Sequence, residues 1–221
     1  RSYVEITDYY VLRKETKYTV KEEHDIIYLW YGDEDKVLEA VPFFANEIDG
    51  SYTYSEIEDH WASHYSRCIE NQLDTVHVPI VHYNTIGKGN KTLINGPKVE
   101  FENSILRTSA NNEVDTGQKP KPASECVIKD TNLNFIFPNT WMNHITPKIK
   151  VIIYFAPVDD EKPYYTFVFI KANKIRIINR IIAFSGKYAN KIIERQDKRV
   201  VITQKPKASS QSSEKLLTDD G

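Results

Sequence analysis

Two histidines with a proline between them form the most informative pair of side chains in the sequence, because imidazoles at this separation can bind a metal ion together. His77 and His82 lie five positions apart, and Pro79 stands between them. On an unbroken helix, this separation would point the two rings about 140° apart, because each residue turns roughly 100°. Proline ends or bends a helix, so His82 can return towards His77. The pair is therefore a candidate for two neighbouring metal ligands, although two structural histidines would give the same spacing.

A carboxylate precedes the first histidine by about one helical turn. Asp74 lies three residues before His77, so the two side chains would share a helical face. A metal-bound histidine usually donates its second N–H to a carboxylate or carbonyl, which fixes its tautomer. We expect Asp74 either to hold His77 in this way or to connect it to a partner, with Asn71 one turn further back. A solvated polar stripe is the alternative.

A third ligand can come from a distant acidic residue, Asp197. Iron(II) oxygen chemistry favours two histidines and one carboxylate on one face of the metal, which leaves other positions open. Asp197 falls four residues after Ile193 and three before Val200, within the apolar stripe of an expected helix over residues 176–204. A carboxylate placed against a core is costly unless it is paired or bound to a metal. Pairing with a neighbouring lysine or arginine is the alternative.

Composition and charge narrow the class of protein. The chain has 221 residues, a net charge of −2 and no dominant basic block, so we expect no nucleic-acid partner. No apolar run reaches about 18 residues, so we expect no membrane span and no membrane partner. Cys68 and Cys126 lie far apart and outside any C-x-x-C pair. They predict two free thiols in a reducing cytoplasm and no cysteine-based metal site.

The elements that must position these residues form an α+β pattern. A hairpin is expected over residues 17–31, a helix over 55–76, a mostly antiparallel sheet from 98 to 172, and a helix over 176–204. Strand candidates are residues 99–101, 104–106, 126–128, 133–137, 149–155 and 164–169. Asn143 and His144 are expected after a strand end, in a turn or, alternatively, as a polar contact of the pocket.

The histidine segment and the late acidic residue together resemble a known family. The residues that carry the resemblance are Glu70, Asn71, Asp74, His77 and His82, followed by Gln196 and Asp197. They resemble the catalytic domain of Rieske non-haem iron oxygenases, closest to the components related to vanillate O-demethylase, dicamba monooxygenase and carbazole dioxygenase. Phe137-Pro138-Asn139 supports this, and residues 18–32 resemble the last strands of the family's Rieske domain.

The resemblance implies a fold, a metal and partners. It implies a helix-grip (START/Bet v 1-like) fold, in which an antiparallel sheet wraps a helix and leaves a pocket. It implies that His77, His82 and Asp197 hold iron(II) for the activation of O2. A small aromatic or other apolar substrate would be hydroxylated, dihydroxylated or oxidatively demethylated, as in aromatic hydrocarbon catabolism. Asp74 would connect His77 to a cluster histidine of a neighbouring subunit in a homotrimer, with Asn71 a looser contributor. A ferredoxin or flavin reductase would supply electrons.

One departure from the family concerns the 2Fe-2S cluster. The family binds it through a C-x-H and a C-x-x-H pair, whereas Cys68 and Cys126 belong to neither. We therefore expect the cluster ligands before Arg1, in the full-length protein, and turnover to fail without them. The expected domains are the end of a Rieske domain at 1–35, a linker at 36–50, the catalytic domain at 51–204 and a flexible tail at 205–221.

Two other functions fit the same residues. A helix-grip domain could hold an apolar ligand without redox activity, in which case no iron is needed and Asp197 is exposed or paired with a cation. Two histidines and a carboxylate also suit zinc with water in the fourth position, but no acid or base for hydrolysis stands out. Candidates for the pocket wall, which core packing would explain equally well, are Phe135, Phe137, Trp141, Tyr154, Phe155 and Phe167.

Overall fold

The computed structural model divides the chain into two compact units, residues 1–42 and 43–221. Each unit is described by itself. The structure describes residues 18–24, 26–37, 40–89, 91–156, 164–170 (backbone only) and 176–209. The start of the chain and the end of the expected tail lie outside these ranges.

The first unit contains a two-stranded hairpin. β1 (Val20–Glu23) pairs antiparallel with β2 (Ile26–Leu29). His24 in the turn has a φ of 56°, a left-handed conformation found in tight turns. One turn of 3-10 helix, η1 (Glu34–Lys36), follows. The hairpin expected over residues 17–31 is confirmed for its described residues.

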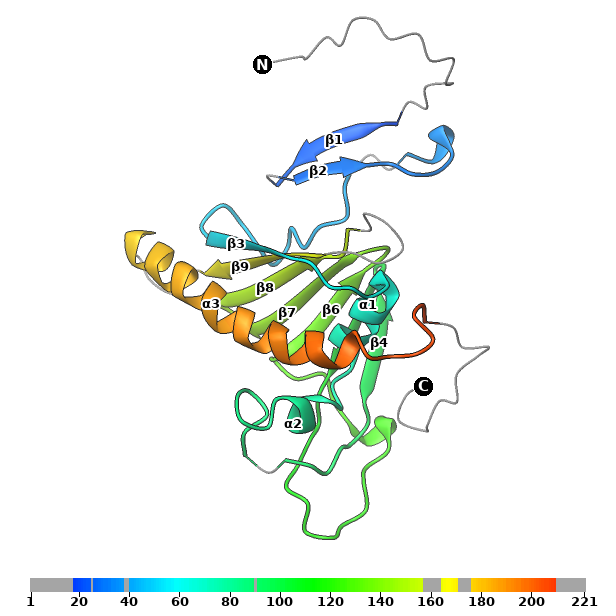
Figure 1. Ribbon diagram of the computed structural model, residues 1–221, viewed down its shortest axis with the longest axis vertical. Helices are drawn as coiled ribbons and strands as arrows, with labels where there is room; N and C mark the ends of the chain where they lie inside the picture. The colour runs from blue at the N-terminus through cyan, green and yellow to red at the C-terminus, as the bar shows by residue number, and fades with distance from the viewer. Residues whose placement is uncertain are drawn as a thin grey trace, which may run out of the picture. The chain divides into compact units, whose positions relative to one another are not determined.

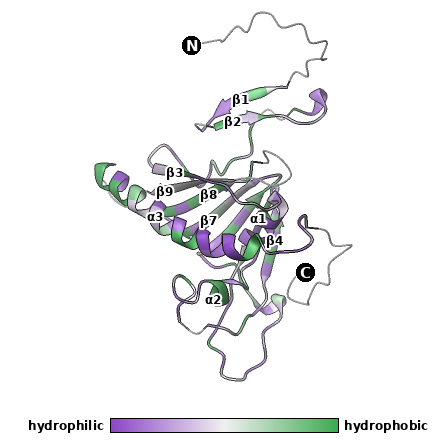
Figure 2. Ribbon diagram, in the orientation of Figure 1, coloured by the Kyte–Doolittle hydropathy of each residue, from purple (hydrophilic) through white to green (hydrophobic). Residues whose placement is uncertain are grey.

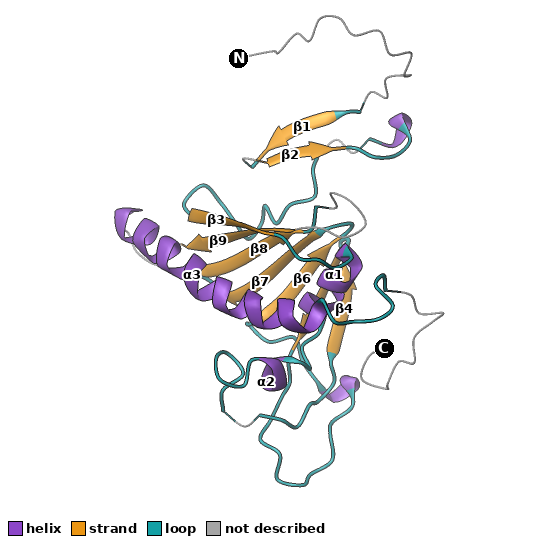
Figure 3. Cartoon of the chain, viewed as in Figure 1, coloured by secondary structure: helices purple, strands orange, loops and turns teal. Residues whose placement is uncertain are grey.

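The second unit is built on one antiparallel sheet of seven described strands (Figures 1 and 3). From β4 to β9 each strand pairs with the next along the chain, and β3 pairs with β9 at the far edge. The antiparallel meander expected from the strand spacing is thereby confirmed. The strands are β3 (Thr53–Asp59), β4 (Lys98–Glu102), β5 (Ile105–Ser109), β6 (Asn132–Ile136), β7 (Thr140–Thr146), β8 (Ile149–Tyr154) and β9 (Tyr164–Ile170).

A long helix, α3 (Arg176–Val201), lies across one face of this sheet (Figure 1). It packs on β3 and β9 and also contacts α1 (Tyr65–Leu73). Ser55 Oγ of β3 donates to the carbonyl oxygen of Ala183 at 2.6 Å, which fixes the helix to the sheet edge. The remaining helices are α2 (Val78–Val81) and one 3-10 turn, η2 (Ala123–Glu125).

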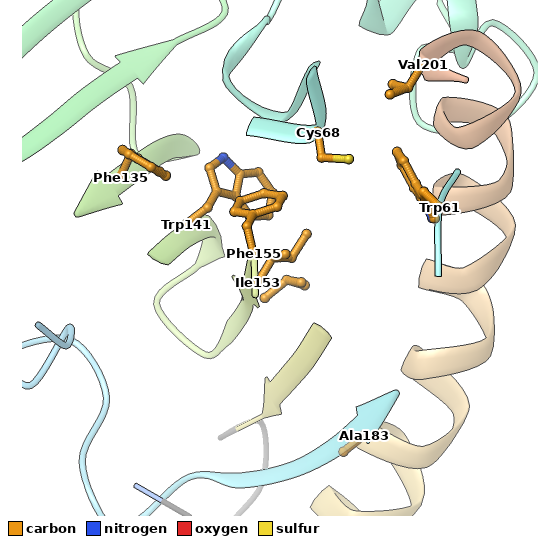
Figure 4. Close-up of a cluster of buried hydrophobic side chains, with 9 residues drawn as sticks. Trp61, Cys68, Phe135, Trp141, Ile153, Phe155, Ala183 and Val201 are labelled. Carbon is orange, nitrogen blue, oxygen red and sulfur yellow. The ribbon is translucent and has the colours of Figure 1, made fainter. Parts of the chain in front are cut away.

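The main core fills the space between the sheet and the helices (Figure 4). Val151, Ile153 and Phe155 point to the same side of β8 and its end, because alternate residues of a strand share a face. The other buried members are Trp61, Cys68, Phe135, Trp141, Ala183 and Val201. Burial raises the pKa of the Cys68 thiol to about 12, so it stays protonated. Both cysteines are free, as the sequence predicted.

The helix predicted over residues 55–76 is wrong in its first part. Residues 53–59 form β3 instead, and α1 begins only at Tyr65. Glu56 and Glu58 suggested a helix N-terminus, where acids are favoured. They alternate with Ile57, which is the period of a strand, and long-range pairing with β9 decides the outcome.

Two expectations within the sheet are also wrong. Asn143 and His144 lie inside β7, paired with β8, and not in a turn, although Asn143 does line a cavity beside His77 and His82. No strand forms at residues 126–128. There the Asn111 side chain donates to the Val127 carbonyl oxygen at 3.1 Å, which satisfies a backbone group without a strand partner.

Candidate metal centre

The two histidines flank one short helix. His77 is the N-cap of α2 and His82 is its C-cap, so a single turn separates them. Pro79 lies in the first turn of α2, where its missing N–H has no intrahelical acceptor in any case. The proline therefore begins a new helix and does not break the earlier one, which already ends at Leu73.

Three donor atoms from distant parts of the chain meet beside α2. His82 Nε2 lies 2.8 Å from Asp197 Oδ1, and His77 Nε2 lies 3.3 Å from the same oxygen. The two Nε2 atoms are 3.3 Å apart. Asp197 is 3% exposed and His82 is 1% exposed, so the group is shielded from water. The structure thus brings together the three residues that the sequence singled out as ligands.

These spacings fit a metal ion. Donors bound at about 2.1 Å and at roughly right angles to each other lie about 3 Å apart. Asp197 Oδ1 is buried and accepts no hydrogen bond from the described residues, despite its two close nitrogen neighbours. A buried carboxylate oxygen without a donor is costly unless a cation compensates it. The arrangement of His77, His82 and Asp197 can therefore hold a metal ion.

The electrostatics of the site favour positive charge. Burial alone would lower the pKa of His77, but the carboxylates of Asp197 and Asp74 outweigh burial and raise the pKa to about 9. Burial would raise the pKa of Asp197, but the adjacent imidazoles of His77 and His82 hold it below its ordinary value. The buried, ionised carboxylate of Asp197 is therefore stabilised either by a protonated neighbouring histidine or by a metal cation.

Gln196 orients His82, a role that the sequence did not reveal. Its Oε1 atom lies 2.7 Å from His82 Nδ1 and accepts a hydrogen bond from Thr85 Oγ1 at 2.9 Å. Its Nε2 atom donates to Asn84 Oδ1 at 2.9 Å. An acceptor at Nδ1 directs the lone pair of Nε2 towards the metal position. The only signal in the sequence was the position of Gln196 next to Asp197.

Replacing Gln196 with leucine should weaken metal binding without unfolding the protein. His82 would lose its acceptor at Nδ1, and loss of such a partner typically costs on the order of 10- to 100-fold in metal affinity. Anaerobic titration with Fe(II) against a competing chelator measures the change. Gln196→Glu, which keeps an acceptor oxygen, is the matched control. Equal iron affinity in Gln196→Leu and the unaltered protein would remove Gln196 from the site.

Asp74 contacts His77 on the ring edge that faces away from Asp197, whereas Asn71 is connected to Asp197 through Gln72. Asp74 Oδ2 is 3.3 Å from His77 Nδ1, while its Oδ1 accepts the Val76 N–H at 2.6 Å. The Asp74 side chain is 40% exposed, unlike the buried ligands. Asn71 is buried and contacts Gln72, whose Nε2 lies 3.3 Å from Asp197 Oδ2. Asn71 is therefore one residue removed from the three donor atoms.

A cavity of about 330 Å³ opens beside the three donor atoms. This volume lies in the range of small-molecule sites. Its wall is mostly apolar and comes from the sheet and α3; the main apolar residues are Leu133, Trp141, Ile145, Val151, Ile153 and Ile193. The cavity can therefore hold a small apolar molecule against the metal position.

Of the aromatic residues expected in the pocket wall, only Trp141 lines this cavity among those with described side chains. Phe135, Tyr154 and Phe155 are buried elsewhere, whereas Phe137 is 59% exposed. The side chain of Phe167 lies outside the described residues. Aliphatic side chains at alternate positions of β8 form much of the wall instead, and single-sequence periodicity cannot distinguish them from plain core.

The sequence matches one family model, the vanillate O-demethylase oxygenase C-terminal domain, over residues 61–220. The chain belongs to this family. The family consists of Rieske oxygenase catalytic domains, which use non-haem iron, so the resemblance found in the sequence is confirmed. The match includes the whole histidine segment and Asp197. No curated protein matches the chain.

Solved structures with the same fold are Rieske oxygenases. A mutant of NdmA from Pseudomonas putida CBB5 with theobromine is 14% identical, with a TM-score of 0.68 over 92% of this chain and 56% of that one. The terminal oxygenase of carbazole 1,9a-dioxygenase from Nocardioides aromaticivorans IC177 is 13% identical, with a TM-score of 0.64 over 92% and 64%. The chain spans just over half the length of the first of these relatives.

Proposed function

We propose that this chain is the catalytic part of a Rieske-type mono- or dioxygenase that activates O2 at a mononuclear iron(II) site. His77, His82 and Asp197 would hold the iron. The observation that carries the proposal is the convergence of three donor atoms within 3.3 Å of one another, two of them on the buried residues His82 and Asp197. The same three residue types on one face of the ion leave positions free for O2 and substrate.

The residues around the iron position would control substrate and water. The apolar wall formed by Trp141, Val151 and Ile193 would bind a small aromatic or other apolar substrate and exclude water from the reacting atoms. Gln196 would hold the His82 ring in place. Iron(II), when bound, would bind and activate O2 for hydroxylation, dihydroxylation or oxidative demethylation, with the electrons coming from the reductase.

Asp74 would carry the connection to the electron source. It contacts His77 on the side opposite Asp197 and is partly exposed, so a neighbouring subunit can reach it. We propose that a Rieske 2Fe-2S cluster of the next subunit in a homotrimer delivers electrons there, after reduction by a ferredoxin or flavin reductase. Asn71 would support the same path. The cluster ligand pairs are not in this sequence, because Cys68 and Cys126 belong to neither.

The proposed function agrees with a helix-grip interpretation of the fold. The antiparallel sheet and α3 enclose the cavity between them, as that fold would require. The β1–β2 hairpin would be the end of a Rieske domain, so that residues 1–35 belong to that domain and 36–50 to a linker. The catalytic domain would cover residues 51–204, followed by a tail at 205–221.

Turnover driven by hydrogen peroxide tests this function without a Rieske cluster. Peroxide supplies one oxygen atom and accepts the two electrons of substrate oxidation, so R–H and H2O2 give R–OH and H2O. We expect the protein loaded with Fe(II) to oxidise at least one member of a panel of vanillate, theobromine and carbazole, the compounds named with the matching family and the similar structures. For a hydroxylated product, mass spectrometry with H2(18)O2 should show the labelled oxygen in that product. For demethylation the inserted oxygen leaves with the methyl carbon as formaldehyde, so the demethylated product and formaldehyde are measured instead.

Two outcomes would change the assignment. Tight binding of a panel member without iron, and with no product, would favour a binding module without redox activity. Stoichiometric zinc in protein purified without added metal, together with hydrolysis of an ester substrate, would favour a zinc hydrolase. Asp197→Ala loaded in the same way is the control, because it keeps the cavity and loses one ligand.

A further inference from the structure

The outer face of α3 exposes a continuous apolar stripe. Its members are 53% to 67% exposed and are Ile177, Ile181, Phe184, Tyr188 and Ile192. They recur every three or four residues, so they lie on one side of the helix, opposite the side packed on the sheet. Figure 2 shows hydrophobic and hydrophilic residues alternating along this helix. Contiguous exposed apolar surface of this kind usually marks an interaction site.

Cations flank this stripe, and no acid of α3 offsets them. Arg180, Lys187 and Lys191 follow one another at helical spacing along one edge of it. The Lys187 Nζ atom lies 4.9 Å from the centre of the Phe184 ring and 5.5 Å from that of Tyr188. The two acids of α3, Glu194 and Asp197, are 2% and 3% exposed. We name the five apolar residues and these three cations the α3 patch.

The neighbouring edge strand does not neutralise the patch either. Ser55 of β3 faces α3, because its hydroxyl bonds to the Ala183 carbonyl. Alternate residues of a strand point to opposite faces, so Glu56 and Glu58 point away from the helix. Asp59 faces α3 but lies 3.4 Å from Lys198, which is outside the patch. The patch therefore presents apolar side chains and positive charge.

The positive charge of the α3 patch indicates which kind of partner could bind it. In a symmetric pair of copies, each residue of the patch would meet the same patch of the partner, and three cations would approach three cations. Like charges brought together in this way oppose pairing of the patch with its own copy, which is a different contact from the head-to-tail interfaces of a cyclic trimer. The charges instead complement an anionic partner.

We propose that the α3 patch attaches the protein to an anionic lipid surface. Its large side chains project from a convex helix in a row, which suits a flat apolar layer beneath negative headgroups better than a second folded surface. The Lys187 ammonium group lies over the Phe184 and Tyr188 rings, so positive charge for the headgroups and aromatic surface for the acyl layer are adjacent. No helix among the described residues is long and apolar enough to cross a membrane. The sequence led us to expect no membrane partner because it has no apolar segment long enough to cross a membrane. Attachment to one leaflet does not require a membrane-crossing segment.

Vesicle co-sedimentation of the purified protein tests this proposal. We expect binding to vesicles of phosphatidylcholine mixed with phosphatidylglycerol and little binding to phosphatidylcholine alone. Each cation near an anionic surface contributes a factor of about five, so Lys187→Glu with Lys191→Glu should weaken binding by at least about tenfold. Phe184→Ser with Tyr188→Ser should weaken it similarly through loss of the apolar contact. The matched controls are Lys119→Glu with Lys148→Glu, and Phe101→Ser, which change exposed residues elsewhere.

Three outcomes would overturn the proposal. Equal binding by the patch variants and their controls would place the lipid contact elsewhere. No binding to anionic vesicles, combined with capture of an acidic protein that the Lys187→Glu, Lys191→Glu variant loses, would assign the patch to a protein partner. Concentration-dependent self-association abolished by Phe184→Ser would assign it to a second copy. Iron content should be the same in all variants, so this test is independent of the metal centre.

Discussion

Asp197→Ala should leave the purified protein almost without iron. The substitution removes the carboxylate oxygen that lies 2.8 Å and 3.3 Å from the two histidine nitrogens. Loss of a residue that only hydrogen-bonds to a metal ligand lowers metal affinity on the order of 10- to 100-fold. Loss of a ligand itself should therefore lower the affinity at least about 100-fold, or about 2.8 kcal/mol. Elemental analysis after anaerobic loading with Fe(II) and desalting measures the iron bound per chain.

Glu194→Gln is the matched control for this experiment. Glu194 is a second buried carboxylate on α3, one turn before Asp197, but it is not one of the three clustered donors. We expect this variant to keep its iron, so that loss in Asp197→Ala cannot be ascribed to removal of a buried charge from the helix. Thermal unfolding of both proteins without metal verifies that they fold. Stoichiometric iron in folded Asp197→Ala would remove Asp197 from the ligand set.

Asp74→Asn should keep the iron and lose most of the turnover in protein that carries a 2Fe-2S cluster. The asparagine carbonyl oxygen can still accept from His77 Nδ1, now 3.3 Å from Asp74 Oδ2, so the tautomer of His77 is preserved. The negative charge that would link His77 to a neighbouring cluster is lost. We expect turnover with the reductase to fall by about 10- to 100-fold. Product formation and iron content are measured on the same sample.

The peroxide-driven reaction separates electron delivery from chemistry at the iron. It bypasses the cluster, so Asp74→Asn should retain the activity of the unaltered protein in that assay. Glu70→Gln, a change one helical turn before Asp74, is the control for general damage to α1. Unchanged turnover with the reductase in Asp74→Asn would refute the connecting role. Equal losses in both assays would show that Asp74 supports the iron site itself.

Much of the scaffold follows from local patterns in the sequence. The continuous apolar run of β8 and the helical stripe that holds Asp197 are strong local signals, and both elements form where they are expected. The spacing of His77 and His82 around a proline also indicated that the two rings could meet. Residue type and spacing were sufficient there because the connection between the histidines is short.

Long-range contacts decide what the sequence could not predict. β3 exists because β9 pairs with it, more than a hundred residues away, and its acids gave a misleading helix signal. The role of Gln196 depends on α3 reaching α2, since its side chain contacts His82 across the fold. The exposed stripe of α3 is another example, because periodicity alone does not reveal which apolar face of a helix is buried.

A crystal structure of the protein loaded anaerobically with Fe(II), with anomalous data at the iron edge, would show whether His77, His82 and Asp197 hold one iron ion. We expect one strong peak within about 2.2 Å of His77 Nε2, His82 Nε2 and an Asp197 carboxylate oxygen. That result would place a single iron at the point where the three donor atoms converge. A peak that lacks Asp197 as a ligand, or iron bound only elsewhere on the chain, would contradict the account.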